Sequence, residues 1–272
     1  MSEKRKRKPT SIETSLTSSK KPTKTPKPTP PSKPSSTPIS SSNNTSNGPL
    51  PKNWPPSFPY LTAPSYSHQL TPSQLSALKV PDPSLPEIRS THTPGPATHV
   101  QITPITDPKH PAYGQCGLFA TQHLPPGSLI LPYLGEYHPG TNPSPSNPIP
   151  SPDGYDYSQS DYDLWLSRDA DIAVDAARLG NEARYVNDYR GVPYPPPPPP
   201  LPGQKLPKQI KGKPNAEFKV AWDVKRQERV MSVWVLPAGK KGLFRGVRKG
   251  EEVLVSYGRG FWEGRRGKEE EE

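Results

Sequence analysis

The stretch NEARYVNDYR occupies residues 181–190 and decides how the rest of the chain is interpreted. It places amides, charges and two tyrosines around the expected end of a short helix, which we predict over residues 176–187 with Asp175 as its cap. A buried asparagine offers donors and an acceptor together, so Asn187 can bind the polar edge of a ring such as adenine or tie two loops together. The stretch alone leaves these two roles open.

Three further stretches, rich in glycine, glutamate and aromatic residues, lie before and after this one. They are YGQCGLFA at 113–120, YLGEY at 133–137 and KGEEVLVSYG at 249–258. Glycines before an apolar strand allow a backbone to approach a ligand closely, and a tyrosine after an apolar strand, such as Tyr257, can present its hydroxyl. Taken singly, the first stretch is explained equally well by a bend before a strand. The other two are explained better by a strand that emerges into solvent and by a packed strand end.

Taken together and in this order, the four stretches resemble the motifs of the SET-domain family of protein lysine methyltransferases. That family has a glycine motif with GLFA, then YLGE, then R-F-x-N-H-x-C-x-P-N, then G-E-E-L-x-x-D-Y-G. The third motif reads here as RYVNDYR at 184–190, with Pro214-Asn215 after an insertion, and the fourth as GEEVLVSYG at 250–258. The resemblance covers about residues 98–262 and implies a β-rich fold with short helices, several small sheets and a threaded, knot-like C-terminal segment.

The resemblance also implies a cofactor, S-adenosylmethionine, bound on one face, and a protein lysine that enters through a narrow channel from the other. It assigns catalysis to Tyr257. It assigns cofactor contacts to Gln115, Cys116, Gly117, Tyr162, Arg184, Asn187 and Asp188. It assigns the walls of the lysine channel to Tyr133, Tyr185, Phe261 and Trp262. Methyl transfer to a neutral amine needs positioning and removal of a proton rather than a metal, so no metal site is expected.

Four residues depart from the family pattern. Asp188 replaces its histidine, Arg190 its cysteine and Ser256 the aspartate before the tyrosine, while Gln115 stands where the first glycine of the cofactor motif often sits. The zinc-bearing cysteine segment that closes the lysine channel in many members is also absent, because Cys116 is the single cysteine of the chain. The two C-terminal aromatic residues of the predicted channel wall would close it instead.

Short β-prone runs, split by proline, glycine and aspartate, begin near Thr98, and three more strands are expected in AEFKVAWDV, ERVMSVWVL and EEVLVSYG. A single helical turn is expected near Thr71–Val80, with Thr71 or Ser73 as its cap and Pro81 after it. We divide the chain into a disordered Ser/Thr/Pro/Lys-rich region at 1–95, a SET domain at 96–264 and a charged tail at 265–272.

Two proline-rich insertions, at 138–152 and 191–214, are expected to leave the SET domain as surface excursions. Proline lacks the backbone N–H that a sheet ladder needs, so neither segment can form a central strand. The unbroken run Pro195–Pro200 can recruit an SH3 or WW-type partner or act as a stiff linker, and the sequence leaves both roles open.

Composition limits the size of the folded part. With 43 prolines, 29% apolar residues and a mean hydropathy of −0.85, the chain cannot be one compact domain throughout. The net charge of +10 comes almost entirely from residues 1–97, which carry +9, so nucleic-acid contact is expected at most through this basic N-terminal region. No stretch approaches the roughly 18 apolar residues of a membrane span, and no membrane association is expected.

The leading hypothesis is a nuclear lysine methyltransferase that acts on a histone tail or another basic chromatin protein. The basic run Lys4–Lys8 fits nuclear import, although a tail that binds polyanions would look the same and a cytoplasmic location stays open. The alternative is a catalytically silent SET module that serves as a scaffold for protein interactions. The presence of Asn187 and Tyr257 favours the enzyme.

Overall fold

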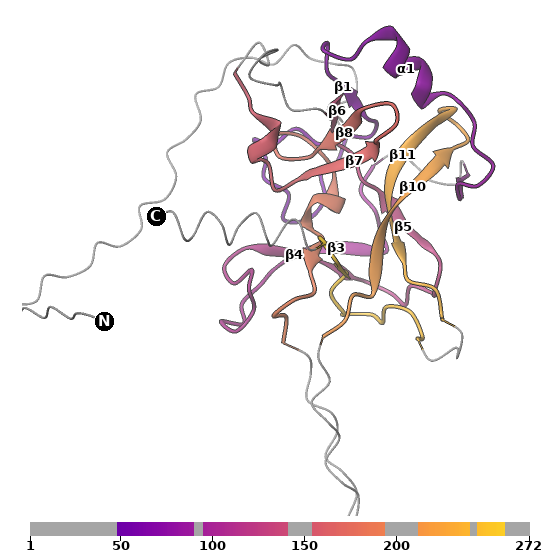
Figure 1. Cartoon of the computed structure of the whole chain (residues 1–272). Coiled ribbons are helices and arrows are strands. Elements are labelled where there is room, and N and C mark those ends of the chain that lie inside the picture. Colours follow the sequence, from indigo (N-terminus) through magenta and orange to yellow (C-terminus); the bar gives the residue numbers. More distant parts are fainter. Residues whose placement is uncertain (1–47, 90–94, 141–153, 194–211, 240–243, 259–272) are drawn as a thin grey trace, which may run out of the picture. The chain divides into compact units, whose positions relative to one another are not determined.

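A computed structural model describes the central part of the chain, and Figure 1 draws that part in colour. The described residues are 48–89, 95–140, 154–193, 212–239 and 244–258. All of them belong to one compact unit of the chain. The predictions for the basic run, for Pro195–Pro200 and for the charged tail therefore fall on residues outside the described part.

One four-stranded sheet is built around the longest hairpin of the unit, and its strand order is β2-β10-β11-β5. β10 (Ala216–Asp223) and β11 (Glu228–Val235) pair antiparallel, and the turn between them places Gln227 at a positive φ of 55°. β5 (Leu129–Pro132) pairs antiparallel with β11, and the short β2 (Glu87–Ile88) pairs parallel with β10. The valine-rich sequence of β11 suits a strand that is buried along most of its length.

A second four-stranded sheet has the order β1-β6-β8-β7. Its central strand β8 (Ile172–Asp175) is buried at every residue and pairs antiparallel with β6 (Glu136–Pro139) and with β7 (Asp163–Ser167). The short β1 (Ser65–Tyr66) adds a parallel edge strand to β6. A 3-10 turn, η1 (Tyr157–Gln159), precedes β7 and is capped by the carboxylate of Asp156.

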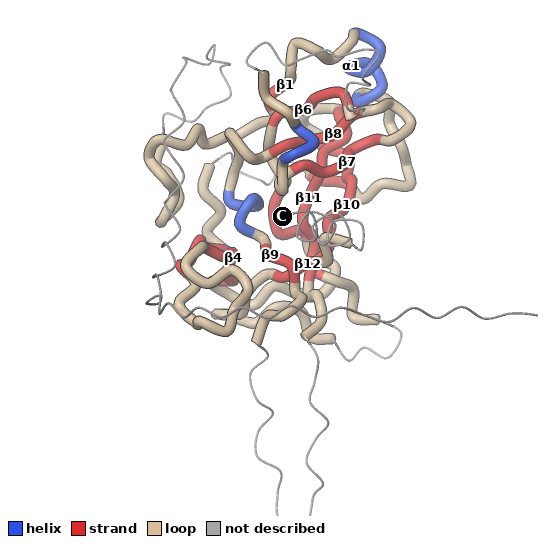
Figure 2. The backbone as a smooth tube through the Cα atoms, turned by 60° about the vertical axis from the view of Figure 1, so that its left-hand side comes forward, coloured by secondary structure: helices blue, strands red, loops and turns tan. Residues whose placement is uncertain are grey.

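Two strand pairs complete the unit. β3 (Val100–Pro104) and β4 (Cys116–Ala120) form an antiparallel pair, and β9 (Asn187–Asp188) pairs in parallel with β12 (Leu254–Val255). β12 also contacts β10, and Figure 2 shows β9 and β12 next to each other between β4 and the long hairpin. The β-rich fold of several small sheets is therefore confirmed, and the strands predicted between residues 98 and 255 are present.

The prediction of disorder for residues 1–95 is wrong for residues 48–89, which are folded onto the sheets. Trp54, Leu61 and Leu78 are each at most 5% exposed and belong to the hydrophobic clusters. This segment has no sequence periodicity because its strands are only two residues long and its apolar side chains pack against distant parts of the chain. The helical turn predicted near Thr71–Val80 is confirmed as α1 (Pro72–Leu78), with Thr71 as its N-cap.

The helix predicted over 176–187 is wrong in length. The structure has only a 3-10 helix, η2 (Glu182–Tyr185), which begins after Asn181. Asp175 ends β8 instead of capping a helix, and its carboxylate accepts a hydrogen bond from the backbone N–H of Ala177. Backbone carbonyls before η2 are bonded elsewhere, since Gly180 accepts from the N–H of Leu61, so the segment cannot close a continuous helical ladder.

The first proline-rich insertion begins later than predicted, because its first two residues belong to β6. His138 is 1% exposed, and its Nε2 atom lies 3.0 Å from the carboxylate of Asp163. The ring of His138 also stacks on Tyr157, with 3.6 Å between centroids. Residues 141–153 and 194–211 of the two insertions lie outside the described part. Among the described residues, no helix is long and apolar enough to cross a membrane.

Candidate functional site

A cleft of about 380 Å³ lies where the loop before β4, η2, β9 and the segment after β12 meet. We call it the Tyr257 cleft. Its lining residues are His110, Pro111, Ala112, Gln115, Cys116, Asp161, Tyr162, Arg184, Tyr185, Asn187, Asp188, Arg190 and Tyr257. They include the predicted catalytic tyrosine, six of the seven predicted cofactor contacts and Tyr185 of the predicted channel wall. Residues that the sequence separates by more than a hundred positions therefore share one hollow.

The parallel pairing of β9 with β12 brings Asn187 and Tyr257 to the same place. Leu254 lies in register with Asn187, and Val255 with Asp188. Tyr257, two residues after this pair, therefore lies close to Asn187, and both line the cleft. The hydroxyl of Tyr257 donates to the carbonyl oxygen of Val186 over 2.7 Å. Asn215 holds this arrangement from the other side, because its side-chain amide bonds to the backbone on both sides of Val253: the N–H of Leu254 and the carbonyl of Glu252.

The three departures from the family pattern around Tyr257 form one network. Asp188 accepts hydrogen bonds from the backbone N–H of Tyr257 over 2.7 Å and from that of Arg190 over 2.8 Å. The guanidinium of Arg190 lies 2.6 Å from the same carboxylate and donates to the hydroxyl of Ser256 over 3.3 Å. Asp188 is 7% exposed, so its negative charge is balanced by these donors rather than by water. The residues at the departing positions therefore fix the backbone of the predicted catalytic tyrosine.

Asn187 is held from behind by two acceptors. Its Nδ2 atom donates to a carboxylate oxygen of Glu252 over 2.8 Å and to the carbonyl of Cys116 over 3.3 Å. The other carboxylate oxygen of Glu252 lies 3.0 Å from Nε2 of His110. Gly117, the predicted cofactor contact that does not line the cleft, lies beside this group, and a Cβ there would approach Glu252 Oε1 to 2.4 Å. A side chain at residue 117 would therefore displace the carboxylate of Glu252 from this position.

His110 and Glu252 are absent from the sequence-based site prediction. His110 lies in a loop with no motif of its own, and Glu252 belongs to the GEEV stretch, where its side chain was given no role. The signal that could have marked Glu252 is its place next to an apolar strand, since a buried carboxylate needs a partner.

Arg184 is enclosed by aromatic rings. Its guanidinium carbon lies 4.3 Å from the ring centre of Phe58, 4.4 Å from that of Tyr162 and 5.1 Å from that of Tyr185. Its Nε donates to the carbonyl of Ala176 over 3.0 Å. Cation–π attraction of this kind stabilises a partly desolvated guanidinium. Arg184 therefore orders two of the predicted site residues, and one of its three rings comes from the segment that was predicted to be disordered.

Tyr133, a predicted wall of the lysine channel, lies behind the cleft rather than on its surface. It is 3% exposed, and its hydroxyl donates to the carbonyl of Tyr162 over 2.6 Å. Burial, together with the nearby charge of Asp175, raises the pKa of Tyr133 well above its usual value, so the hydroxyl stays protonated. The other two predicted wall residues, Phe261 and Trp262, lie outside the described part.

Polar side chains on the wall of the cleft can bind and orient a polar ligand. Burial raises the pKa of the Cys116 thiol above its usual value, so the thiol stays neutral near pH 7 and is a poor nucleophile. Burial likewise raises the pKa of Tyr185. Two arginines and two aspartates line the described part of the cleft, so positive and negative side chains are balanced there: Arg184, Arg190, Asp161 and Asp188.

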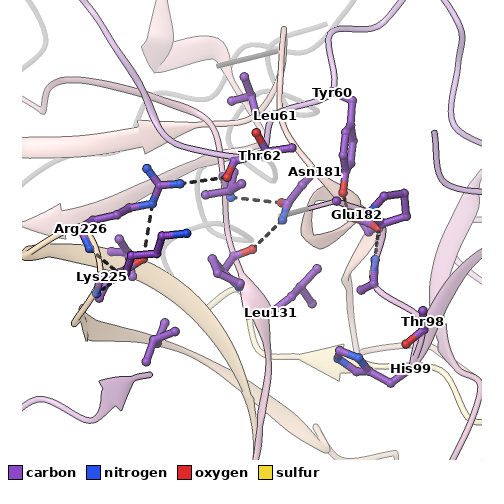
Figure 3. A pocket seen from close by; sticks show the side chains of 18 of the residues that line it. Tyr60, Leu61, Thr62, Thr98, His99, Leu131, Asn181, Glu182, Lys225 and Arg226 are labelled. Atoms are coloured by element: carbon purple, nitrogen blue, oxygen red, sulfur yellow. Dashed lines mark hydrogen bonds and ion pairs between the residues drawn. The ribbon is translucent and has the colours of Figure 1, made fainter. Parts of the chain in front are cut away.

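A second cavity, of about 290 Å³, is lined by residues of the sheet β2-β10-β11-β5, by residues 60–62 and 95–99 and by the start of η2, and is shown in Figure 3. Its buried polar groups bond to the fold itself. Glu182 is 2% exposed and accepts from the hydroxyl of Tyr60 over 3.0 Å and from the N–H of Ala97 over 2.8 Å. Asn181 likewise donates to the carbonyl of Pro132 and accepts from the N–H of Leu134. The Tyr257 cleft is therefore the better candidate for a ligand site.

Comparison with known proteins finds similarity to solved structures alone. The chain matches no protein-family profile and no curated protein. Among solved structures it is similar to the Chaetomium thermophilum polycomb repressive complex 2, at 19% identity and a TM-score of 0.33, over 59% of this chain and 15% of that one. A form of that complex in an autoinhibited conformation bound to S-adenosylmethionine matches at 19% identity and a TM-score of 0.36, over 64% and 17%. The chain thus spans less than a fifth of the length of these structures.

Proposed function

We propose that this chain is a SET-type methyltransferase that moves the methyl group of S-adenosylmethionine to the side-chain amine of a protein lysine. The observation that carries the proposal is the Tyr257 cleft, in which residues from the glycine, NEARYVNDYR and GEEVLVSYG stretches meet. Such convergence is not expected if each stretch were only a bend or a strand end. The network of Asp188, Arg190 and Ser256 supports an intact site, because these residues satisfy one another and Tyr257 together.

The lining residues fit the proposed cofactor. Asn187 and the backbone beside Gly117 would hold its polar groups, and the aromatic rings around Arg184 would line its ring system. When bound, the cofactor supplies a methyl group activated on a sulfonium. Because the hydroxyl of Tyr257 donates to Val186, its position is fixed, and its oxygen can still accept from an amine that enters the cleft. Loss of water around that amine, as it enters the cleft, would favour its neutral, nucleophilic form.

A methyl-transfer assay tests the proposal. Full-length protein is incubated with S-adenosylmethionine labelled in its methyl group, with core histones and, separately, with a nuclear lysate. Transfer by the wild type is expected to fall at least tenfold in Tyr257→Phe, because the positioned hydroxyl is lost. The matched control is Tyr113→Phe, the same change at a tyrosine that is 58% exposed and does not line the cleft.

The same experiment separates the two candidate functions. Binding of S-adenosylmethionine without transfer to any histone or lysate protein would reject the enzyme and leave the silent scaffold. Absence of cofactor binding would reject both the cofactor and the enzyme. For the target, we propose a histone tail or another basic chromatin protein and a nuclear location. Labelled products in the histone fraction support that choice, and label confined to other lysate proteins contradicts it.

A further inference from the structure

A chain of buried polar groups runs from the loop before β4 to the cleft. The backbone N–H of Ala112 donates to Nδ1 of His110 over 3.0 Å, and Nε2 of His110 lies 3.0 Å from Glu252. The second oxygen of Glu252 lies 2.8 Å from Nδ2 of Asn187. The side chains of His110 and Glu252 are 7% and 8% exposed, so water does not replace these contacts. Three segments far apart in the sequence are thereby joined.

The hydrogen bond from the N–H of Ala112 to His110 fixes the direction of the other hydrogen bonds in this series of polar groups. A backbone N–H can only donate, so Nδ1 of His110 must be the unprotonated nitrogen and Nε2 must carry the hydrogen. Nε2 then donates to one carboxylate oxygen of Glu252, which accepts. The atom of Asn187 that faces Glu252 is consequently the amide nitrogen. The carbonyl of Cys116, which also faces that nitrogen, requires the same assignment.

This polarity decides what Asn187 presents to the cleft. Both amide hydrogens are directed to acceptors behind the side chain, at Glu252 and Cys116. The remaining polar atom, Oδ1, is an acceptor, and Asn187 lines the cleft. A side chain at residue 117 would prevent the arrangement, since a Cβ on Gly117 would lie 2.4 Å from Glu252 and 3.1 Å from Asn187.

We propose that His110 and Glu252 are positioning residues that lock the amide of Asn187 with Oδ1 toward the cleft, so that it selects a ligand group that donates an N–H. The inference rests on the proposed function, because the ligand group is taken to belong to S-adenosylmethionine, which carries an ammonium and an adenine amino group. His110 and Glu252 act through Asn187 and touch no reacting atom. His110 belongs to none of the four motifs, and Glu252 lies in the GEEVLVSYG motif but has no role in the predicted site.

Two amide substitutions at His110 separate positioning from packing. Glutamine places an amide nitrogen near the position of Nε2 and keeps the donor to Glu252, whereas asparagine reaches only the position of Nδ1 and loses it. We expect His110→Asn to weaken the binding of S-adenosylmethionine roughly tenfold, as for a lost charge-assisted hydrogen bond. His110→Gln is expected to keep most of the affinity. Calorimetric titration of the full-length proteins measures both, and equal affinities for the two variants would overturn the proposal.

Adjacent glutamates give a second matched pair. Glu252→Gln puts an amide NH₂ opposite the NH₂ of Asn187 if its oxygen still accepts from His110, so we again expect a loss of roughly tenfold in affinity. Glu251→Gln is the control, since Glu251 lies next to it in the chain but pairs with Arg248 at an exposed site. Affinity that is unchanged in Glu252→Gln would contradict the proposal, and so would an equal loss in the control.

A readout without ligand keeps this inference distinct from the proposed function. In ¹H–¹⁵N spectra, the side-chain NH₂ pair of Asn187, assigned by its disappearance in Asn187→Asp, is expected to shift in His110→Asn and Glu252→Gln but to move little in His110→Gln and Glu251→Gln. If the wild type does not bind S-adenosylmethionine and these shifts are seen, the proposed function fails and the positioning stands. If it binds and the pair is the same in all variants, the positioning fails and the proposed function stands.

Discussion

Three of the four residues that differ from the SET-domain motifs hold Tyr257 in place. Asp188 takes up the backbone N–H of Tyr257, and Arg190 joins that carboxylate to Ser256. Without Arg190, the carboxylate of Asp188 would be a buried negative charge with no cation beside it, and such a charge is costly. The residues at 188, 190 and 256 therefore form one network of partners around Tyr257.

This network predicts that Asp188 and Arg190 are energetically coupled. Asp188→Asn removes the charge and one acceptor, and Arg190→Gln removes the matching cation. A double-mutant cycle on methyl transfer or on unfolding by urea is expected to give a coupling energy of roughly 0.5–3 kcal/mol. Asp169→Asn, at an exposed aspartate, serves as the control for loss of one negative charge. Strictly additive effects of the two substitutions would show that the network is not a unit.

At the scale of elements, the sequence predicts the parts whose signal is local. β10, β11 and β8 follow from short runs rich in β-branched and aromatic residues, and the cap of α1 follows from Thr71 before Pro72. Parts held by distant partners could not be predicted. The segment 48–89 has no period of its own, and the carbonyls before η2 are taken by other segments. His110 and Glu252 become partners only when the fold places them 3.0 Å apart.

The segment 48–89 is expected to stabilise the fold and to hold one wall of the Tyr257 cleft in place. Trp54 packs edge-on against Phe58, Tyr60 and Tyr185, at centroid distances of 5.1 to 5.9 Å. Trp54→Ala should lower the free energy of unfolding by about 3–5 kcal/mol, as for a large buried aromatic residue. It should also weaken cofactor binding, because Tyr185 lines the cleft.

The control for that variant is Trp165→Ala, at a tryptophan of β7 that is 38% exposed. Urea unfolding and calorimetric titration of both proteins make the comparison. A loss of stability in Trp54→Ala that is no larger than in Trp165→Ala would show that the segment is only loosely attached to the sheets.

At the scale of the whole molecule, several buried carboxyls tie stability to pH. Burial raises the pKa of Asp175, of Glu182 and of Glu228 above their usual values. Each folded-state carboxyl therefore binds its proton more tightly than the unfolded chain does. Stability from such a group is greatest below the unfolded pKa, about 4.3 for glutamate, and declines as pH rises through the folded pKa.

Glu182→Gln tests this dependence at one position. The amide can accept from Ala97 and donate to the hydroxyl of Tyr60, so the contacts of the side chain can be kept. The free energy of unfolding of the wild type, relative to that of the variant, should fall as pH rises from about 4, by at most about 1.4 kcal/mol per pH unit. Urea titrations at a series of pH values measure it. A difference that stays constant with pH would mean that burial does not shift this carboxyl.

The parallel pairing of β9 with β12 has a consequence for the order in which the protein becomes competent. The hydroxyl of Tyr257 and the carbonyl that fixes it are 71 residues apart. On a ribosome, the strands of the two larger sheets emerge before Glu252, and the cleft lacks one wall until the strand after it has docked. A chain interrupted before residue 252 is therefore expected to form both larger sheets but to bind no ligand in the cleft, so that binding reports that residues 252–258 have been made and have docked.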